Sequence, residues 1–294
     1  MIEGIPSWLA HSLILLALGY ASYTDLRTRE VPDLLNYTLM AMGILISLTA
    51  SIFLESIIPV YHSIAGLIVG YLLGALMFYT GQWGGGDAKM LMAVGSFHGF
   101  AIGQLLSGSI PILLTIFLSF LIVGSLYSIL YALVLVLANR KLISRMFHER
   151  YKSSHKKFFY VFSTVLLFLF IFILLFVAPS FSRTTLLIFI VFILLSYVFL
   201  MFGKVVESSI LIKTIPLSKV TVGDWIVEDV MLDGSRVCGP KDLGISQKQI
   251  RTLKDHNVKS LKVKYGIPFI PGFLLGYVTI LIFGNWLSAL ILLL

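Results

Sequence analysis

Two aspartates border strongly apolar segments, where an acidic side chain is costly unless it has a task. Asp25 directly follows the first apolar segment, and Asp87 opens the fourth within the sequence Gly84-Gly85-Gly86-Asp87-Ala88-Lys89. A carboxylate near lipid loses hydration, so an ionisable residue in such a position is a candidate functional residue. The three glycines before Asp87 remove every side chain beside it. They predict that another chain comes close to this carboxyl group.

Two carboxyl groups that are brought together can carry out the hydrolysis of a peptide bond. They cannot both ionise easily, so they share a proton and titrate as a pair. One carboxylate takes a proton from water, the water attacks the peptide carbonyl, and the protonated partner stabilises the oxyanion. We therefore predict that Asp25 and Asp87 form a catalytic pair. Because Asp25 ends one helix and Asp87 begins another, helix dipoles predict more negative charge on Asp87.

Each of these residues also has a plain structural interpretation. Asp25 could be a solvated acid balanced by nearby arginines such as Arg27, and Asp87 could be the N-cap of the fourth helix. Lys89 could be an interface lysine whose ammonium group reaches water. Asp33, after a proline, could cap the second helix. Residue type and spacing leave these alternatives open.

No other chemical motif competes with the two acids. The six histidines lack metal-ligand spacing, and a single cysteine, Cys238, excludes an internal disulfide or a Cys-x-x-Cys site. We therefore expect no metal and no cofactor. The sequence also contains no Gly-x-Ser-x-Gly elbow and no Walker A loop. Since the glycine run 84–86 follows an apolar segment in place of a strand, phosphate binding is disfavoured.

The composition is that of a multi-pass membrane protein. Hydrophobic residues make up 58% of the 294 residues and charged residues only 12%, whereas soluble domains carry roughly 25% charged residues. The 22 Lys and Arg against 14 Asp and Glu give a net charge of +8. The positive-inside rule explains this excess, so we expect membrane lipid around the chain and no nucleic-acid partner. The first residues lack the basic region of a signal peptide, which predicts that the first apolar segment is retained.

Eight apolar segments approach the roughly 20 residues that cross a bilayer. They are expected near residues 8–24, 37–54, 63–80, 87–106, 110–138, 158–178, 184–202 and 269–294. The loop that precedes the sixth segment is rich in Lys and Arg, so it is predicted to be cytoplasmic. Counting spans from that loop places Asp25 and Asp87 at the cytoplasmic face and both termini on the opposite side.

The third apolar segment carries Gly66, Gly70 and Gly74 at intervals of four residues. This spacing aligns the three glycines on one helix face and lets another helix backbone approach closely. We predict that the stripe holds this helix, which leads to the Gly84–Asp87 turn, against a neighbour.

One stretch, 203–267, has the composition of a soluble domain. Runs of β-branched residues predict strands near 209–215, 220–230 and 258–264. Asp233-Gly234 is a turn signal, and Ser246 with Gln249 forms a capping box that opens a short helix.

The fold class is therefore an all-α polytopic membrane protein of about eight transmembrane helices, with a small cytoplasmic α+β or β-rich domain inserted before the last helix. The expected parts are a membrane catalytic core at 1–138, a basic cytoplasmic loop at 139–157, spans six and seven at 158–202, the soluble domain at 203–267 and the last span at 268–294.

Two motifs, in this order and on the same predicted face, resemble a known family. Asp25-Leu26-Arg27-Thr28-Arg29-Glu30-Val31-Pro32-Asp33 is similar to the first catalytic motif of type IV prepilin peptidases and archaeal preflagellin peptidases. Gly84–Lys89 is similar to the GxGD motif of the same membrane aspartic proteases, including the lysine. The start of the last span, at residues 266–271, resembles the archaeal branch.

The resemblance covers roughly the first 110 residues and implies that Asp25 and Asp87 are catalytic. The supporting or substrate-contacting residues would be Gly84, Gly85, Gly86, Lys89 and Arg27. It also implies cleavage of the short basic leader of pilin-like or archaellin-like precursors at the cytoplasmic membrane face. The chain lacks the cysteine-rich loop of many bacterial members, so their N-methyltransferase activity is not expected here. Its eight predicted spans exceed the six that are usual in the family.

Other functions use similar residues. A proton-coupled transporter also needs membrane acids, but such sites lie near the bilayer midplane between repeats, and no repeat is present. Presenilin-type proteases share GxGD, but their Pro-Ala-Leu motif is absent. A scaffold whose soluble domain binds a partner would use the two acids only as helix caps.

Overall fold

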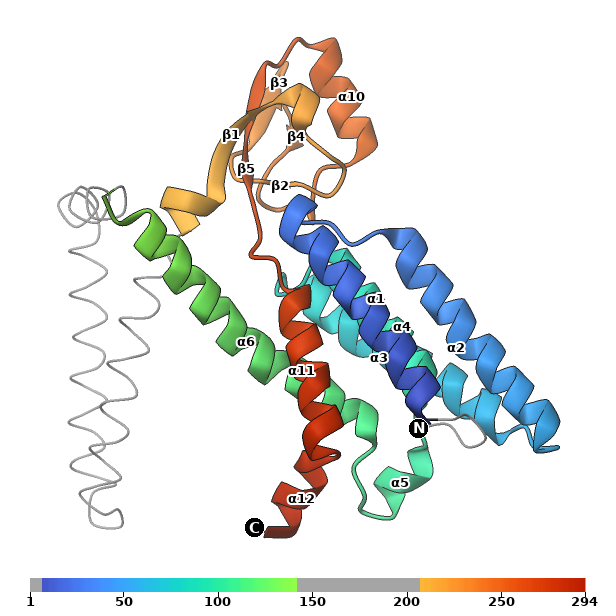
Figure 1. Cartoon of the computed structure of the whole chain (residues 1–294). Coiled ribbons are helices and arrows are strands. Elements are labelled where there is room, and N and C mark those ends of the chain that lie inside the picture. The colour runs from blue at the N-terminus through green and yellow to red at the C-terminus, as the bar shows by residue number, and fades with distance from the viewer. Residues whose placement is uncertain (1–6, 142–206, 294) are drawn as a thin grey trace, which may run out of the picture. The chain divides into compact units, whose positions relative to one another are not determined.

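The computed structural model describes residues 7–141 and 207–293, which fall into two units (Figure 1). One unit contains the residues up to Tyr131 and those from Gly266 onward, and the other runs from Ala132 to Tyr265. The described chain is mostly helical, with a small β-containing region near the C-terminus. The predicted sixth and seventh spans, and most of the basic loop 139–157, lie outside the described residues.

The first unit consists of helices. They are α1 (Ser7–Thr28), α2 (Asp33–Phe53), α3 (Ile58–Tyr79), α4 (Gly85–His98), α5 (Ile102–Leu106), α6 (Ile112–Ala138), α11 (Ile270–Phe283) and α12 (Trp286–Leu293). The last turns of α6, from Ala132 onward, belong to the other unit. In the described ranges, α2, α3 and α6 are long and apolar enough to cross a membrane. They agree with the predicted second, third and fifth segments, and α1 covers the predicted first.

Two predicted spans are broken by glycines. The expected helix 87–106 divides into α4 and α5, because Gly99 has a φ of 69°, in the left-handed region that glycine tolerates. With 14 residues, α4 is about 21 Å long and shorter than a bilayer core. The expected helix 269–294 divides in the same way at Gly284, whose φ is 61°. The prediction of one continuous helix was wrong in both places.

The predicted glycine stripe on α3 is confirmed, and α4 is the neighbour that it contacts. Gly66, Gly70 and Gly74 are buried. A methyl group at Gly70 would lie 2.9 Å from the carbonyl oxygen of Leu91, and one at Gly74 would lie 2.9 Å from that of Ala88. The backbones of α3 and α4 therefore touch, so α3 fixes the helix that carries Asp87.

A second close helix contact joins α6 and α11. A methyl group at Gly272 would meet Cα of Gly124 at 2.7 Å, and one at Gly276 would meet the carbonyl oxygen of Ser119 at 3.0 Å. The Phe120 and Phe273 rings stack beside this contact with centroids 4.2 Å apart. Elsewhere in this unit, α1 packs mainly against α11, whereas α4 packs mainly against α3 and α2.

The second unit has a small antiparallel sheet, a hairpin and one helix. The elements are the π-helical turn η3 (Glu207–Leu211), β1 (Ile212–Pro216), the 3-10 turn η4 (Leu217–Lys219), β2 (Trp225–Ile226), β3 (Val230–Leu232), β4 (Ser235–Cys238), α10 (Gln247–Asp255) and β5 (Ser260–Lys264). The sheet has the order β1-β5-β2, and β3 pairs with β4. Val263, Leu253 and Cys238 are fully buried in its apolar core.

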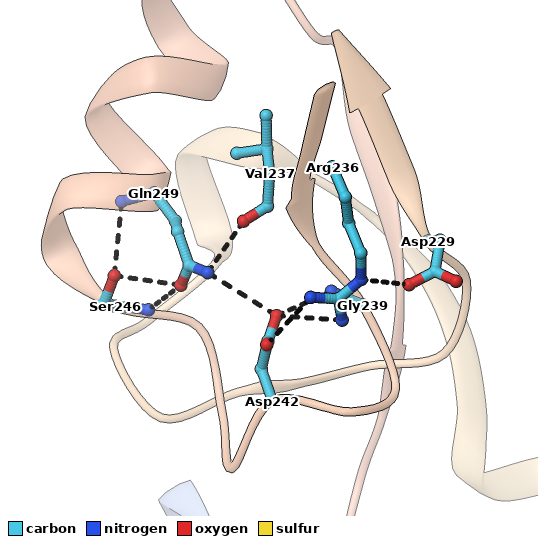
Figure 2. A network of polar contacts seen from close by, with 7 residues as sticks. All are labelled: Asp229, Arg236, Val237, Gly239, Asp242, Ser246 and Gln249. Carbon is cyan, nitrogen blue, oxygen red and sulfur yellow. Dashed lines mark hydrogen bonds and ion pairs between the residues drawn. The ribbon is translucent and has the colours of Figure 1, made fainter. Parts of the chain in front are cut away.

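Local signals in this unit are confirmed where they are strongest. Asp233-Gly234 turns between β3 and β4, and Ser246 with Gln249 caps α10. The predicted strand 220–230 was wrong over most of its length, because Gly223 has a φ of 97° and the Thr221 N–H donates to Asp224 in a turn. The strand predicted at 209–215 begins only at Ile212. Arg236 of β4 joins a polar network with Asp229 and Asp242 (Figure 2).

Candidate functional site

Asp25 lies in the last turn of α1 and is held by a different helix. Its side chain is 6% exposed. Its Oδ2 accepts the backbone N–H of Ile270, the first residue of α11, at 3.0 Å. The first N–H groups of a helix have no partner within the helix and carry partial positive charge. Asp25 thus supplies a carboxyl group to the N-terminus of α11.

This contact changes the prediction from helix dipoles. That prediction counted only the C-terminal end of α1, which disfavours negative charge on Asp25. The N-terminus of α11 favours negative charge at the same carboxyl group. Helix ends therefore favour charge on both aspartates and do not single out Asp87.

Asp87 is held by its own turn. The N-cap of α4 is Gly84, and Asp87 is the third residue of the helix, so the interpretation of Asp87 as N-cap was wrong. The Gly84 N–H donates to Asp87 Oδ2 at 2.9 Å. The charge of Asp25 acts on Asp87. The structure thus brings these two carboxyl groups, which are far apart in sequence, into electrostatic range of each other.

The three glycines before Asp87 have different surroundings. A methyl group at Gly86 would lie 2.9 Å from Cβ of Val31, whereas at Gly85 its nearest contact would be the Phe78 ring at 3.8 Å. Gly84 is exposed. The space in the Cβ direction of Gly86 is therefore filled by Val31, whereas Gly84 and Gly85 have no such close contact. Substrate contact by the three glycines stays a prediction.

Asn36 is a site residue that the sequence analysis missed. It lies on α2 with no exposed surface, and its Nδ2 donates to the carbonyl oxygen of Gly86 at 3.2 Å. Its Oδ1 has no hydrogen-bond partner in the described part of the chain. The available signal was a polar amide in an apolar run, one turn after Asp33. Asn36 ties the start of α2 to the turn that carries Asp87.

Lys89 joins the same two helix starts. Its ammonium group lies 2.6 Å from Oδ1 of Asp33, the first residue of α2. It also lies 5.3 Å from the centroid of the Tyr37 ring. Lys89 thus has a specific anionic partner. Asp33 has a cationic partner in addition to being the first residue of α2.

The two arginines after Asp25 differ in their contacts. Arg27, the predicted supporting residue, lies over the Tyr23 ring of its own helix, with Cζ 5.1 Å from the ring centroid. Arg29 has a φ of 59° and donates from its guanidinium group to the carbonyl oxygen of Gly266. Arg29 therefore links the end of α1 to the segment that leads into α11.

Trp83 anchors the glycine turn on the other side. It is 4% exposed, and its ring centroid lies 4.8 Å from that of Phe273, 5.8 Å from that of Phe117 and 5.9 Å from that of Phe269. These rings belong to α6 and to the start of α11. Aromatic contacts therefore fix the turn before Asp87 against the helix whose first N–H binds Asp25.

The arrangement suits acid–base chemistry on a water molecule. General acid–base catalysis needs one group that accepts a proton and one that donates it, and neighbouring carboxyl groups can divide these roles. Among the described residues, no group of three or more His, Cys, Asp or Glu side chains could hold a metal ion.

Comparison with known proteins points in the same direction. Residues 12–136, which include both aspartates, match the model of the type IV leader peptidase family. The chain is 34% identical over 88 residues to a preflagellin peptidase of Methanococcus voltae (30% of this chain, 37% of the relative). It is 38% identical over 81 residues to one of Methanococcus maripaludis (28% and 35%), and 35% identical over 81 residues to one of Methanocaldococcus jannaschii (28% and 34%). The matched region spans about a third of each of these curated relatives.

Proposed function

We propose that this chain is a membrane aspartic endopeptidase, because residues 12–136 match the model of the type IV leader peptidase family. Its substrates are pilin-like or archaellin-like precursors, from which it removes a short basic leader, the class III signal peptide. The observation that carries the proposal is the pair Asp25 and Asp87, which both lie in the matched segment and are each held by a backbone N–H group, of Ile270 and of Gly84. We assign the catalytic roles to these two residues.

In the proposed reaction, the two carboxyl groups hold one proton between them. The ionised carboxyl group removes a proton from water, and the water oxygen bonds to the carbon of the scissile carbonyl. The protonated carboxyl group donates a hydrogen bond to the oxygen that becomes negative. The C–N bond then breaks, the leaving nitrogen takes a proton, and the leader departs with a new carboxylate.

The residues around the pair have positioning roles in this proposal. The Ile270 N–H holds Asp25, and the Gly84 N–H holds Asp87. Asn36 and Lys89 fasten the start of α4 to α2. A substrate strand would approach on the side of Gly84 and Gly85, which carry no side chain of their own.

We further propose the finer membrane topology and domain organisation that the sequence predicts. The catalytic core is 1–138, followed by the cytoplasmic loop 139–157, two further spans within 158–202, the cytoplasmic domain 203–267 and the last span 268–294. This gives about eight spans in a cell membrane, with the site facing the cytoplasm, where precursors are made. The three apolar helices of spanning length and the β-containing region support this organisation.

The direct test is to incubate the purified chain, reconstituted in liposomes, with a pilin-like precursor that carries a basic leader. Mass spectrometry of the products should locate one cut at the end of the leader, and the Asp87→Asn variant should produce none. Absence of cleavage by correctly folded protein would overturn the proposal. Cleavage inside the apolar segment that follows the leader would indicate a presenilin-like protease. Proton-coupled solute uptake without cleavage would indicate a transporter.

A further inference from the structure

A second polar cluster lies in the first unit, and the proposed reaction does not use it. The Tyr277 hydroxyl lies 2.9 Å from Nδ1 of His11 and 2.8 Å from Nε2 of His98. Tyr277 has no exposed surface, and His98 is 5% exposed. These three residues, which we call the hydroxyl clasp, come from α11, α1 and α4. They join the two helices that carry the aspartates to the helix that binds Asp25.

A single hydroxyl group serves both rings of the clasp. A tyrosine O–H donates one hydrogen bond and accepts another, so it can pair with one ring nitrogen that carries a proton and one that does not. Nδ1 of His98 has no hydrogen-bond partner within the described residues. The bond to Tyr277 is therefore the one that compensates the burial of this ring, and losing it is costly in an apolar interior.

The clasp and the aspartates lie at different levels of the same three helices. At 1.5 Å per residue, His11 is about 21 Å from Asp25 along α1, and His98 is about 16 Å from Asp87 along α4. Tyr277 is about 10 Å from Ile270 along α11. The three helices are thus connected at two levels: around the carboxyl groups and at the clasp.

The packing of the unit explains why a second connection matters. Asp25 belongs to a pair of helices, α1 and α11, that pack mainly on each other, whereas Asp87 belongs to α4, which packs mainly on α3 and α2. Trp83 connects these two groups at the level of the aspartates. The bond between Tyr277 and His98 connects them at the other level. The helices also share an apolar core, whose contacts are not directional. Among the polar and aromatic contacts, these two act at separate levels and oppose rotation of one group about the other.

We propose that Tyr277 is a positioning residue that sets the approach of Asp25 to Asp87 by joining His11 and His98. The expected loss of catalytic rate rests on the proposed function, whereas the expected change in the separation of the two aspartates does not. Loss of the clasp leaves the helices joined by Trp83 and by the non-directional contacts of their shared apolar core, so the carboxyl groups sample a wider range of separations. Catalysis depends steeply on such placement, since a misplacement of about 1 Å can cost a hundredfold in rate.

The test measures both consequences in the full chain. Spin labels are attached at Thr28→Cys and Gln82→Cys, which are exposed positions beside the two aspartates, in a Cys238→Ala background. Tyr277→Phe should broaden the distance distribution between the labels and lower kcat for leader cleavage about tenfold or more, with KM nearly unchanged. Tyr71→Phe is the matched control, because it removes a hydroxyl group from a residue of α3 that is 51% exposed, and it should change neither quantity.

Substitutions at His98 provide a second, independent arm. Glutamine can place a polar group near the position of Nε2, so His98→Gln should resemble the wild type, whereas His98→Leu should resemble Tyr277→Phe. If Tyr277→Phe does not fold, the comparison of His98→Gln with His98→Leu tests the proposal. An unchanged distance distribution in Tyr277→Phe or His98→Leu would overturn the proposal. Since the distance measurement needs no substrate, absence of cleavage by the wild type would refute the proposed function and leave this result standing.

Discussion

Two turns in different units hold a carboxyl group by the same backbone contact. In the first unit, the Gly84 N–H donates to Asp87 Oδ2 at 2.9 Å. In the second unit, the Gly239 N–H donates to Asp242 Oδ2, also at 2.9 Å. Both contacts join a glycine to an aspartate three residues later. The turn alone therefore cannot be what distinguishes a candidate catalytic acid from a structural one.

The charged partner makes the difference. The Arg236 guanidinium donates to both carboxylate oxygens of Asp242, at 3.1 Å and 3.3 Å, and Gln249 adds a longer contact (Figure 2). Arg236 also binds Asp229 at 2.6 Å. Asp87 instead experiences the charge of another carboxyl group, that of Asp25. The same local geometry thus holds an arginine-paired carboxylate in one unit and, in the other, the carboxyl group to which we assign a catalytic role.

The largest effect is expected at the pair formed by Asp25 and Asp87. Asp25→Asn and Asp87→Asn should each lower kcat/KM for leader cleavage by about a thousandfold or more, because each removes a group that exchanges a proton in the reaction. Asp242→Asn is the matched control and should retain cleavage when activity is expressed per folded protein. Strong activity in Asp25→Asn or Asp87→Asn, or loss of activity in folded Asp242→Asn, would remove the distinction between the two turns.

A smaller effect, on stability, is expected from substitutions of the glycines before Asp87. Gly86→Ala should lower the free energy of unfolding by about 1–3 kcal/mol, because its methyl group would meet Val31 at 2.9 Å. Gly85→Ala introduces the same methyl group beside an ordinary contact with Phe78, so it should be nearly neutral. Thermal unfolding in detergent, followed for both variants, checks this. Equal midpoints would mean that Val31 yields freely.

The pairing of Asp242 with Arg236 should make the stability of the second unit depend on pH. Burial acts to raise the pKa of Asp242, but hydrogen bonds from Arg236 and Gly239 outweigh it and hold that pKa below its ordinary value. A lowered pKa in the folded state means that this carboxylate stabilises the unit at neutral pH. The stabilisation is lost as the pH falls below about 4 and through the folded-state pKa.

The protection factors of the β4 and α10 amides in the full chain, which are corrected for the intrinsic pH dependence of exchange, should therefore fall on acidification. Arg236→Gln should weaken protection at neutral pH and flatten this dependence. An Arg236→Gln variant with the wild-type profile would show that the arginine does not set the state of Asp242.

The smallest effect is expected at Lys89, whose ammonium group pairs with Asp33 although Asp87 is closer in sequence. The two side chains are 30% and 59% exposed, so solvent screens the pair. A double-mutant cycle of Lys89→Met and Asp33→Asn should give a coupling of about 0.2–1 kcal/mol that declines with salt. A coupling several times larger that does not respond to salt would mean that the pair is more enclosed than this exposure implies.

Local patterns in the sequence predicted much of this arrangement. The glycine stripe on α3, the turn at Asp233 and the capping box at Ser246 each depend on a few neighbouring residues, and each was confirmed. The breaks at Gly99 and Gly284 were not predicted. A glycine in an apolar run fits a continuing helix or its end, and tertiary contacts decide between them.

The contacts that orient the candidate site could not be read from local sequence. Asp25 binds the N–H of Ile270, which is 245 positions away, and Val31 fills the space beside Gly86. Such contacts arise from the packing of distant helices, which no short pattern encodes. For the same reason, the sequence suggested the pair of acids but identified neither the support from Asn36 nor the role of α11.

The central claim is that Asp25 and Asp87 act as one unit, and a comparison of three variants tests it most directly. Cleavage of a leader-bearing precursor would be measured for Asp25→Asn, Asp87→Asn and the double variant, with folding checked in each. Residues that act as a unit are strongly non-additive, so all three variants should fall to the same residual rate. A double variant whose loss equals the product of the two single losses would contradict the account, because the two carboxyl groups would then act independently.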